Sequence, residues 1–319
     1  MFDYNEAFSR NIGWLTEQEQ QILRNKRIAI AGMGGVGGVH LLTLVRLGIQ
    51  NFNISDFDSF EIGNFNRQVG ANINTISQDK AITLQQMAKA INPDVNINIF
   101  DKITDDNCDK FLEKVDLYVD GIDFFAVNGR GLVFNKCAEF KIPAITAAPI
   151  GMGVSYVIFN ENSMSFNDYF QWLNKSEKEK LVSFMIGLTP KPMHLKYLVD
   201  HSKVDFQNKK GPSTIMACEL CAGVVGTEVL KILLHRTKIY CAPYFHQFDA
   251  YCRKYKRGYL LLGNKNPIQK IKSWYITKIL NKTNSILSNK SNKYINKYSV
   301  ISKILDLARW APSGDNIQP

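Results

Sequence analysis

The 319-residue sequence has no long hydrophobic run, and its six cysteines and five histidines follow no regular pattern. Its apolar stretches, such as LLTLV at 41–45, are far shorter than the roughly 20 residues that a membrane span requires. The first ten residues also lack the basic and then apolar pattern of a secretory signal. We therefore expect a cytoplasmic protein with reduced thiols and no membrane partner.

Acidic residues are scarce relative to basic ones, which gives a formal net charge of +10. Such an excess is found in proteins that bind nucleic acids or other anions. Much of it falls in a Lys/Asn/Ser-rich segment at 264–297, which we interpret as a solvated linker. On charge alone we therefore do not expect nucleic acid as a partner.

Short apolar strands and helices alternate regularly up to residue 159. Strands are predicted at 27–32, 52–58, 95–100, 116–123, 142–151 and 153–159, and helices at 14–25, 39–47, 80–91, 106–114 and 128–140. This order predicts an α/β fold, a Rossmann-like parallel sheet with helices on both faces. A smaller mixed second half follows, with a long apolar helix at 213–234.

We divide the chain into one large domain, a linker and a short tail. The domain covers 1–263, and it comprises an N-terminal helical part (1–25), a Rossmann-like core (26–159) and a substrate-side extension (160–263). The linker covers 264–297 and the tail 298–319.

A glycine-rich loop, GMGGVGG at 32–38, lies between the first strand and the following helix. Gly32, Gly34 and Gly37 occupy the GxGxxG positions of a dinucleotide-type fingerprint. Glycine lets backbone N–H groups approach a phosphate, and a helix N-terminus adds partial positive charge. Asp56 ends the next strand, where an acid can accept hydrogen bonds from ribose hydroxyls. The pattern predicts a nucleotide site without distinguishing NAD from ATP.

The residues that follow this acid favour ATP. Asn64, Arg67, Gln68 and Lys80 provide polar groups suited to a triphosphate. An arginine fork and a lysine point charge can hold the phosphates and neutralise charge on a pentavalent α-phosphorus. A nicotinamide enzyme has no need of this cluster. The alternatives are an NAD(P)-binding oxidoreductase and a non-catalytic nucleotide-binding partner subunit.

Six motifs follow one another along the chain: RIAIAGMGGVGG, SDFD, EIGNFNRQ, QDKA, INPDV and VDGID. In this order they resemble the ThiF/HesA/MoeB family of adenylyltransferases, relatives of the ubiquitin-activating enzymes, and a looser likeness extends to about residue 263. The resemblance implies ATP and Mg²⁺ as cofactors and transfer of AMP to a carboxylate, with release of pyrophosphate. It also implies the substrate class: the C-terminus of a ubiquitin-like or sulfur-carrier protein ending in Gly-Gly, a peptide, or a tRNA-borne acid.

The resemblance also implies a role for each matched residue. The residues lining the nucleotide would be Gly32, Gly34, Gly35 and Gly37. Asp56 would hold the ribose, with Asp58 beside it. The phosphates would be contacted by Asn64, Arg67, Gln68 and Lys80. Asp123 would position Mg²⁺ or the substrate's end, with Phe124 standing where the family often has asparagine. Arg10 matches an arginine that the family places in the partner subunit's active site, which implies a homodimer. We expect the catalytic set to be Arg10, Arg67, Lys80 and Asp123.

The cysteine spacing does not favour a metal site. Many members of the family bind zinc through two C-x-x-C pairs, whereas this chain has one pair, Cys218 and Cys221. Residues three apart on a helix share a face, so this pair can simply pack in a core. No cysteine lies between Cys137 and Cys218, where relatives carry a thioester loop. We therefore expect neither zinc nor the usual thioester chemistry.

The last residues, ILDLARWAPSGDNIQP, resemble the start of a nitroreductase-family domain. The likeness covers only about 22 residues, 298–319. A flavin site of that family needs a sheet and a dimer partner, so we do not expect this segment to bind FMN. It is consistent with a fusion of an adenylyltransferase to an oxidoreductase-like domain.

Overall fold

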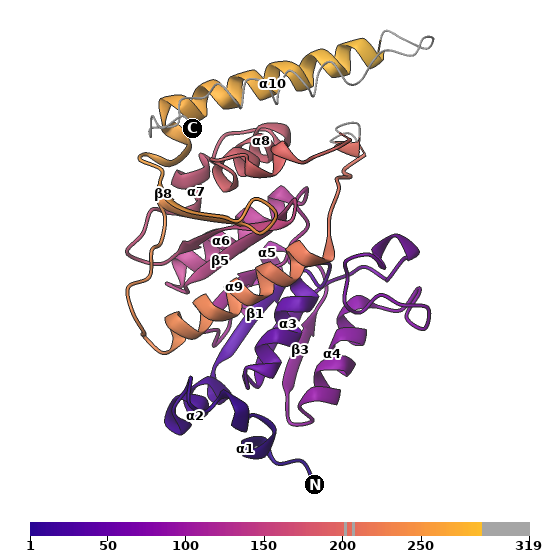
Figure 1. Ribbon diagram of the computed structural model, residues 1–319, viewed down its shortest axis with the longest axis vertical. Coiled ribbons are helices and arrows are strands. Elements are labelled where there is room, and N and C mark those ends of the chain that lie inside the picture. The colour runs from indigo at the N-terminus through magenta and orange to yellow at the C-terminus, as the bar shows by residue number, and fades with distance from the viewer. Residues whose placement is uncertain (201–202, 206–207, 289–319) are drawn as a thin grey trace.

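The structure, a computed structural model, describes residues 1–200, 203–205 and 208–288 (Figure 1). It contains an eight-stranded sheet in the order β3-β2-β1-β4-β5-β6-β7-β8. The strands are β1 (Arg27–Ala31), β2 (Asn51–Ser55), β3 (Asn96–Phe100), β4 (Leu117–Asp120), β5 (Ala144–Ile150), β6 (Gly153–Phe159), β7 (Tyr244–Asp249) and β8 (Lys254–Tyr259). Strands β1 to β5 pair in parallel, and β6, β7 and β8 are added antiparallel. The predicted α/β, Rossmann-like architecture is confirmed, and the second half extends the same sheet.

Helices cover both faces of this sheet (Figure 1). One face carries α3 (Gly37–Arg46), α4 (Lys80–Ile91) and α9 (Ile215–Leu233), and the other carries α5 (Asp105–Phe111), α6 (Val127–Glu139), α7 (Phe166–Phe170) and α8 (Glu177–Leu188). Helix α10 (Pro267–Ser288) lies on the outer side of α8. The short 3₁₀ turns are η1 (Ser9–Asn11), η2 (Ile62–Asn64), η3 (Met193–Lys196) and η5 (Gly263–Lys265).

Strand β1 illustrates why the core has two halves. Ile28 and Ile30 belong to the apolar cluster under α3, α4 and α9, whereas Ala29 and Ala31 belong to the cluster under α5 to α8. Because parallel strands are covered on both faces, they read as continuous apolar runs instead of alternating ones.

The N-terminal segment packs at the edge of the sheet where β1 begins. Helix α1 (Tyr4–Ala7) is followed by α2 (Glu17–Asn25), which begins with a capping box between Thr16 and Glu19. The Tyr4 hydroxyl donates to the Gly48 carbonyl at 2.6 Å, and Asn11 Nδ2 donates to the Leu47 carbonyl at 3.4 Å. These contacts hold the segment against the C-terminal end of α3.

Helix α10 corrects the interpretation of 264–297 as a solvated linker. It spans Pro267–Ser288, and buried amide side chains from the preceding turn η5 and from its own first turn bind the backbone of α8. Asn264 Nδ2 donates to the Ser183 carbonyl at 2.8 Å, and Gln269 Nε2 donates to the Ile186 carbonyl at 2.8 Å. This contact is made by amide side chains and not by an apolar stretch of sequence. Composition alone therefore does not reveal that α10 packs on α8.

The nitroreductase-like tail, 298–319, and residues 289–297 of the predicted linker lie outside the described residues. Within the described ranges, none of the helices combines the length and apolar character that crossing a membrane would need.

Candidate functional site

The glycine loop at the carboxyl end of β1 is pressed against the loop that follows β4. Gly32 has a φ of +88°, and a Cβ there would lie 2.2 Å from the Gly121 carbonyl oxygen. A Cβ on Gly37 would lie 1.7 Å from the Gly32 carbonyl oxygen. These two positions must be glycine for the loop to turn into α3 and to leave room for the neighbouring loop.

The loop presents free backbone donors at the start of α3. Within the described part of the chain, the amides of Gly34, Gly35, Val36 and Gly37 have no hydrogen-bond acceptor. Helix α3 is 10 residues long, and no side chain among the described residues caps its N-terminus. Unpaired amides at a helix N-terminus form a cradle for an anion, so this loop fits a phosphate group.

An acidic pair and a lysine line the next side of the loop. The Met33 amide donates to Asp56 Oδ2 at 2.6 Å, and the Asp58 amide donates to Asp56 Oδ1 at 2.8 Å. Burial raises the pKa of the Asp56 carboxyl, although both amides oppose the shift. Lys80 Nζ lies 3.1 Å from Asp58 Oδ2, and only 7% of the lysine is exposed.

Arg67 and Gln68 lie beside the glycine loop from a different segment. A Cβ on Gly34 would be 3.7 Å from Gln68 Nε2, and a Cβ on Gly35 would be 3.6 Å from Arg67 Cγ. Gln68 Oε1 is buried without a hydrogen-bond partner in the described structure. An unsatisfied acceptor in this position is suited to a ligand that donates a hydrogen bond, such as a hydroxyl or an amino group.

Asn64 supports the backbone of this pair through hydrogen bonds. Its carbonyl accepts the amides of Arg67 and Gln68, at 3.1 and 2.9 Å, and its Oδ1 accepts the Glu61 amide at 3.0 Å. The Asn64 side chain therefore caps the turn at η2, and its backbone carbonyl holds the start of the segment that carries Arg67 and Gln68.

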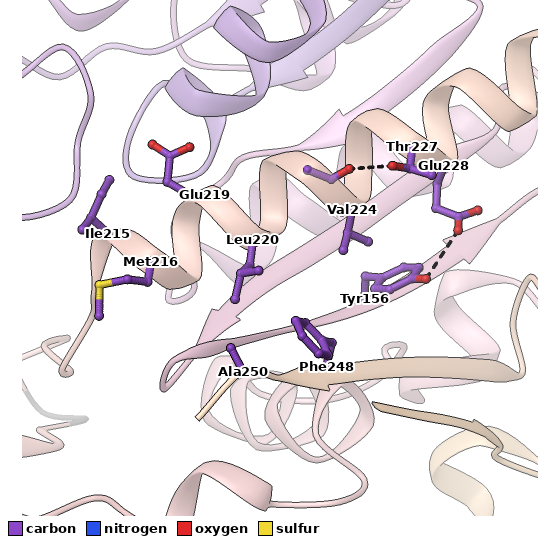
Figure 2. A pocket seen from close by; sticks show the side chains of 11 residues that line it. Tyr156, Ile215, Met216, Glu219, Leu220, Val224, Thr227, Glu228, Phe248 and Ala250 are labelled. Carbon is purple, nitrogen blue, oxygen red and sulfur yellow. Dashed lines mark hydrogen bonds between the residues drawn. The ribbon is translucent and has the colours of Figure 1, made fainter. Parts of the chain in front are cut away.

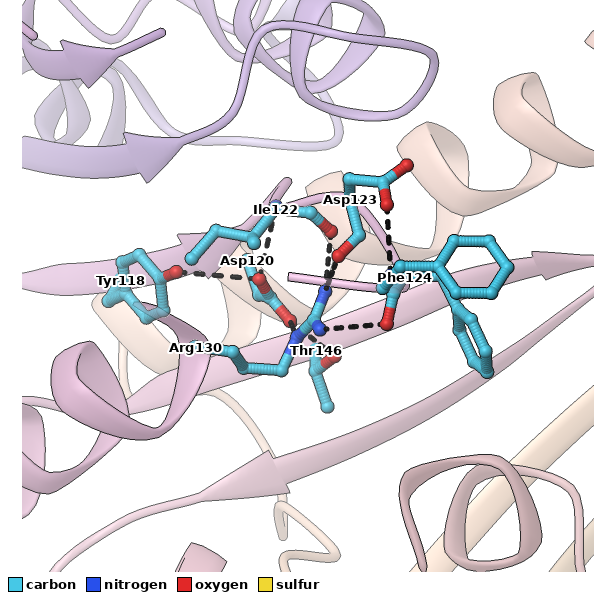
Figure 3. A network of polar contacts seen from close by, with 8 residues as sticks. Tyr118, Asp120, Ile122, Asp123, Phe124, Arg130 and Thr146 are labelled. Carbon is cyan, nitrogen blue, oxygen red and sulfur yellow. Dashed lines mark hydrogen bonds and ion pairs between the residues drawn. The ribbon is translucent and has the colours of Figure 1, made fainter. Parts of the chain in front are cut away.

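The loop after β4 is held by a buried ion pair that the sequence analysis missed (Figure 3). Arg130 Nε donates to Asp120 Oδ2 at 2.7 Å, and both residues are at most 3% exposed. Thr146 Oγ1 donates to the same Asp120 oxygen at 2.7 Å. The Arg130 guanidinium also donates to the carbonyls of Ile122, Asp123 and Phe124.

Asp123 is the exposed tip of that loop. Its Oδ1 accepts the Phe125 amide at 2.9 Å, which leaves the carboxylate directed away from the buried network (Figure 3). Because Gly121 touches Gly32, this tip lies at the same sheet edge as the glycine loop. One accessible carboxylate beside a phosphate cradle fits Mg²⁺, which proteins commonly hold through one or two carboxylates plus substrate phosphates.

Arg10 is the predicted site residue that the structure does not bring to the others. It is exposed on η1, which packs against the C-terminal end of α3. The glycine loop lies at the other end of that helix, which is about 15 Å long. Within one chain, Arg10 is therefore remote from the phosphate cradle.

Cys218 and Cys221 pack in the core as α9 passes over the sheet. Burial raises the pKa of both thiols, so both stay protonated at neutral pH and are weak nucleophiles. Over the described ranges, no group of three or more His, Cys, Asp and Glu side chains is arranged to hold a metal ion.

The strand order and the glycine loop define a Rossmann-type fold, in which the candidate nucleotide site lies at the carboxyl ends of β1, β2 and β4. A profile of the ThiF family matches residues 8–269, and the chain belongs to that family. This membership favours ATP over a nicotinamide cofactor.

Comparisons with known proteins agree with the family. HesA of Leptolyngbya boryana is 31% identical over 137 residues, which cover 43% of this chain and 49% of HesA. This chain therefore matches about half the length of that relative. A probable molybdopterin-synthase adenylyltransferase of Gracilaria tenuistipitata var. liui is 25% identical over 313 residues, covering 92% of this chain and 85% of the relative.

Among solved structures, E. coli MccB with ATP has a similar fold. Its TM-score is 0.59 at 18% identity, with 82% of this chain and 73% of MccB covered. At this identity the likeness concerns the fold alone.

Proposed function

We propose that this protein is an ATP-dependent adenylyltransferase that activates a carboxylate as an acyl adenylate and releases pyrophosphate. The observation that carries the proposal is a row of amides, at Gly34 to Gly37, that have no acceptor in the described structure. Arg67 lies beside Gly35, and Lys80 pairs with Asp58, whose amide donates to the same Asp56 carboxylate as the Met33 amide of the loop. The Gracilaria relative, whose name includes adenylyltransferase, and the family profile support the reaction type.

The residues suit a reaction in which the protein positions groups instead of transferring protons. A carboxylate is already a nucleophile, so it needs no general base. The loop amides, Arg67 and Lys80 would hold the triphosphate and offset charge that develops at the α-phosphorus. Asp56 would accept hydrogen bonds from the ribose hydroxyls. Mg²⁺ beside Asp123 would neutralise charge on the phosphates.

Pyrophosphate exchange tests this function directly. Purified protein, ATP and Mg²⁺ are incubated with radiolabelled pyrophosphate and a candidate carboxylate, and label entering ATP is measured. The first candidates are a ubiquitin-like protein ending in Gly-Gly, a peptide with a free C-terminus, and a tRNA-borne acid. Binding of ATP without exchange on any carboxylate would favour the non-catalytic alternative, and binding of NAD in place of ATP would favour an oxidoreductase.

A methyl group at Gly34 should block the nucleotide without disturbing the fold. A Cβ at this position meets nothing closer than 3.7 Å, so Gly34→Ala should keep its melting temperature. The same Cβ would stand where a phosphate approaches the amides, and we expect at least about tenfold weaker ATP binding. Calorimetric titration and thermal unfolding measure the two effects, with Gly129→Ala, which also has open space at its Cβ, as the control. Unchanged ATP affinity would contradict the phosphate role of the loop.

We further propose a homodimer in which Arg10 enters the partner's site. A groove of about 760 Å³ runs along α9 and over β6 and β7 (Figure 2). It is lined largely by apolar side chains, including Ile215, Met216, Leu220, Val224 and Phe248. Aromatic residues and methionine are enriched in subunit interfaces, and this face supports a second copy as its occupant.

Mixing two inactive variants distinguishes action across subunits from action within one. Arg10→Ala and Lys80→Met are each expected to be inactive alone. If Arg10 acts in the partner's site, mixed dimers have one intact site of two. After full exchange half of the dimers are mixed, so about a quarter of the wild-type activity should return. If activity did not return although subunit exchange was verified, Arg10 would not act in the partner's site.

A further inference from the structure

A second cavity, of about 650 Å³, lies between α8 and α10, away from the nucleotide loop. Phe184 on the inner face of α8 contacts Arg130 and Phe124, whereas the neighbouring residue Ser183 lines the cavity on the outer face. The cavity wall formed by 270–278 lies beyond the residues that the family profile matches. This cavity is therefore not part of the site described above.

Three lysines converge on the cavity with one carboxylate. Lys175, Lys270 and Lys278 all line it. In the part of the chain that the structure describes, none of these lysines lies within 4.0 Å of a carboxylate. The Glu179 carboxylate is engaged in capping α8, where it accepts the Ser176 amide at 2.9 Å and its hydroxyl at 2.7 Å. The cavity thus carries an excess of positive charge.

Lys175 is held at the cavity in an unfavourable environment. Its Nζ donates to Ser183 Oγ at 2.6 Å, and burial lowers the pKa of the ammonium group. A partly buried ammonium with a neutral acceptor gains most from an anion placed beside it.

The facing side of α10 combines these cations with an aromatic ring and hydroxyl groups. Lys270, Trp274 and Lys278 follow one another at four-residue spacing, so they share a helix face with Ser273 and Thr277. The Trp274 ring is 62% exposed, and Lys278 Nζ lies 4.9 Å from its centroid. Facing sides of packed helices are normally apolar, whereas this one offers a flat ring with charged and hydroxyl groups around it.

We propose that this cavity binds a nucleotide, with its phosphate between Lys175, Lys270 and Lys278 and its base on Trp274. Lysines and hydroxyl groups are donors suited to phosphate oxygens, and an exposed aromatic ring stacks with any base. The volume falls within the range of small-molecule sites. The same chemistry is offered by a free mononucleotide and by one nucleotide of a single-stranded RNA.

Binding is measured in the 319-residue chain carrying Arg67→Ala and Lys80→Met, so that the proposed ATP site does not contribute and either proposal can fail alone. The probes are uridine monophosphate and a decamer of uridylate. Their binding is measured by titration calorimetry and by the change in tryptophan fluorescence. We expect saturable binding that weakens at least about tenfold in a further Lys270→Gln/Lys278→Gln variant. Trp274→Leu should weaken binding and remove the fluorescence change.

The control is the matched pair Lys89→Gln/Lys110→Gln, which removes two exposed lysines from α4 and α5. It has the same net charge as the Lys270→Gln/Lys278→Gln variant. Tighter binding of the decamer than of the monophosphate assigns the nucleotide to an RNA strand, and equal affinity assigns it to a free nucleotide. The proposal is overturned if neither probe binds, or if the matched pair weakens binding as much as the cavity variant does.

Discussion

Replacing Lys80 with methionine should abolish carboxylate-dependent pyrophosphate exchange while the protein stays folded. Lys80 is the first residue of α4, where the helix dipole is positive, and its ion-pair partner Asp58 is largely exposed. The fold therefore stabilises this buried ammonium group poorly, and a bound phosphate should stabilise it better. Loss of one such charged donor typically costs ~3–4 kcal/mol of transition-state stabilisation, or a rate lower by about 10²- to 10³-fold.

The measurement pairs exchange kinetics with urea unfolding. We expect Lys80→Met to unfold at a urea concentration equal to or above that of the wild type, because the buried charge is gone. Arg67→Ala, at a half-buried residue beside Gly35, should also lose exchange and stay folded. Lys89→Met, in the last turn of the same helix and exposed, is the matched control and should leave both measurements unchanged. Exchange retained in both Lys80→Met and Arg67→Ala would refute the proposed phosphate site.

Replacing Arg130 with alanine should give the largest loss of stability among single substitutions at the site. The change leaves the Asp120 carboxylate buried without its ion pair, and it also removes the donor to three carbonyls of the 122–124 loop. Breaking a buried pair from one side typically costs about 3–5 kcal/mol of folding free energy. Equilibrium urea unfolding measures this loss, and Arg46→Ala, which removes an exposed arginine from α3, is the control.

A double variant without either charge separates the buried unpaired carboxylate from general packing. In Asp120→Asn/Arg130→Met both charges are absent, so part of the lost stability should return relative to Arg130→Ala. Activity should not return with it, because the loop that presents Asp123 would still lack its three carbonyl contacts. If the double variant were as unstable as Arg130→Ala, the buried charge would not be the cause.

The glycine loop and its neighbours were predictable because each is a local pattern. The pattern lies within about 30 residues and consists of a strand, closely spaced glycines and an acid at the end of the next strand. Lys80 begins a helix, and the predicted bounds of that helix, 80–91, agree with the structure. The carboxyl ends of parallel strands share one edge of the sheet, so these groups meet once the strand order is set.

Arg130 and Asp120 were missed for the opposite reason. Nothing in the sequence around Arg130 indicates that its side chain turns back from α6 to the end of β4, because that contact depends on how the helix packs. One usable signal is the presence of two acids in VDGID, only one of which ends the strand. Similarly, α8 and α10 meet through Asn264 and Gln269, which look like surface residues until their carbonyl partners are known.

The continuity of the eight-stranded sheet constrains how the molecule can be divided. Strand β6 hydrogen-bonds to β5 on one side and to β7 on the other, so a fragment ending near residue 159 would expose a complete unpaired strand edge. Such an edge recruits other chains and favours aggregation. A fragment that keeps every strand of the sheet paired would have to end after β8, so the residues before and after 159 are expected to fold as one unit.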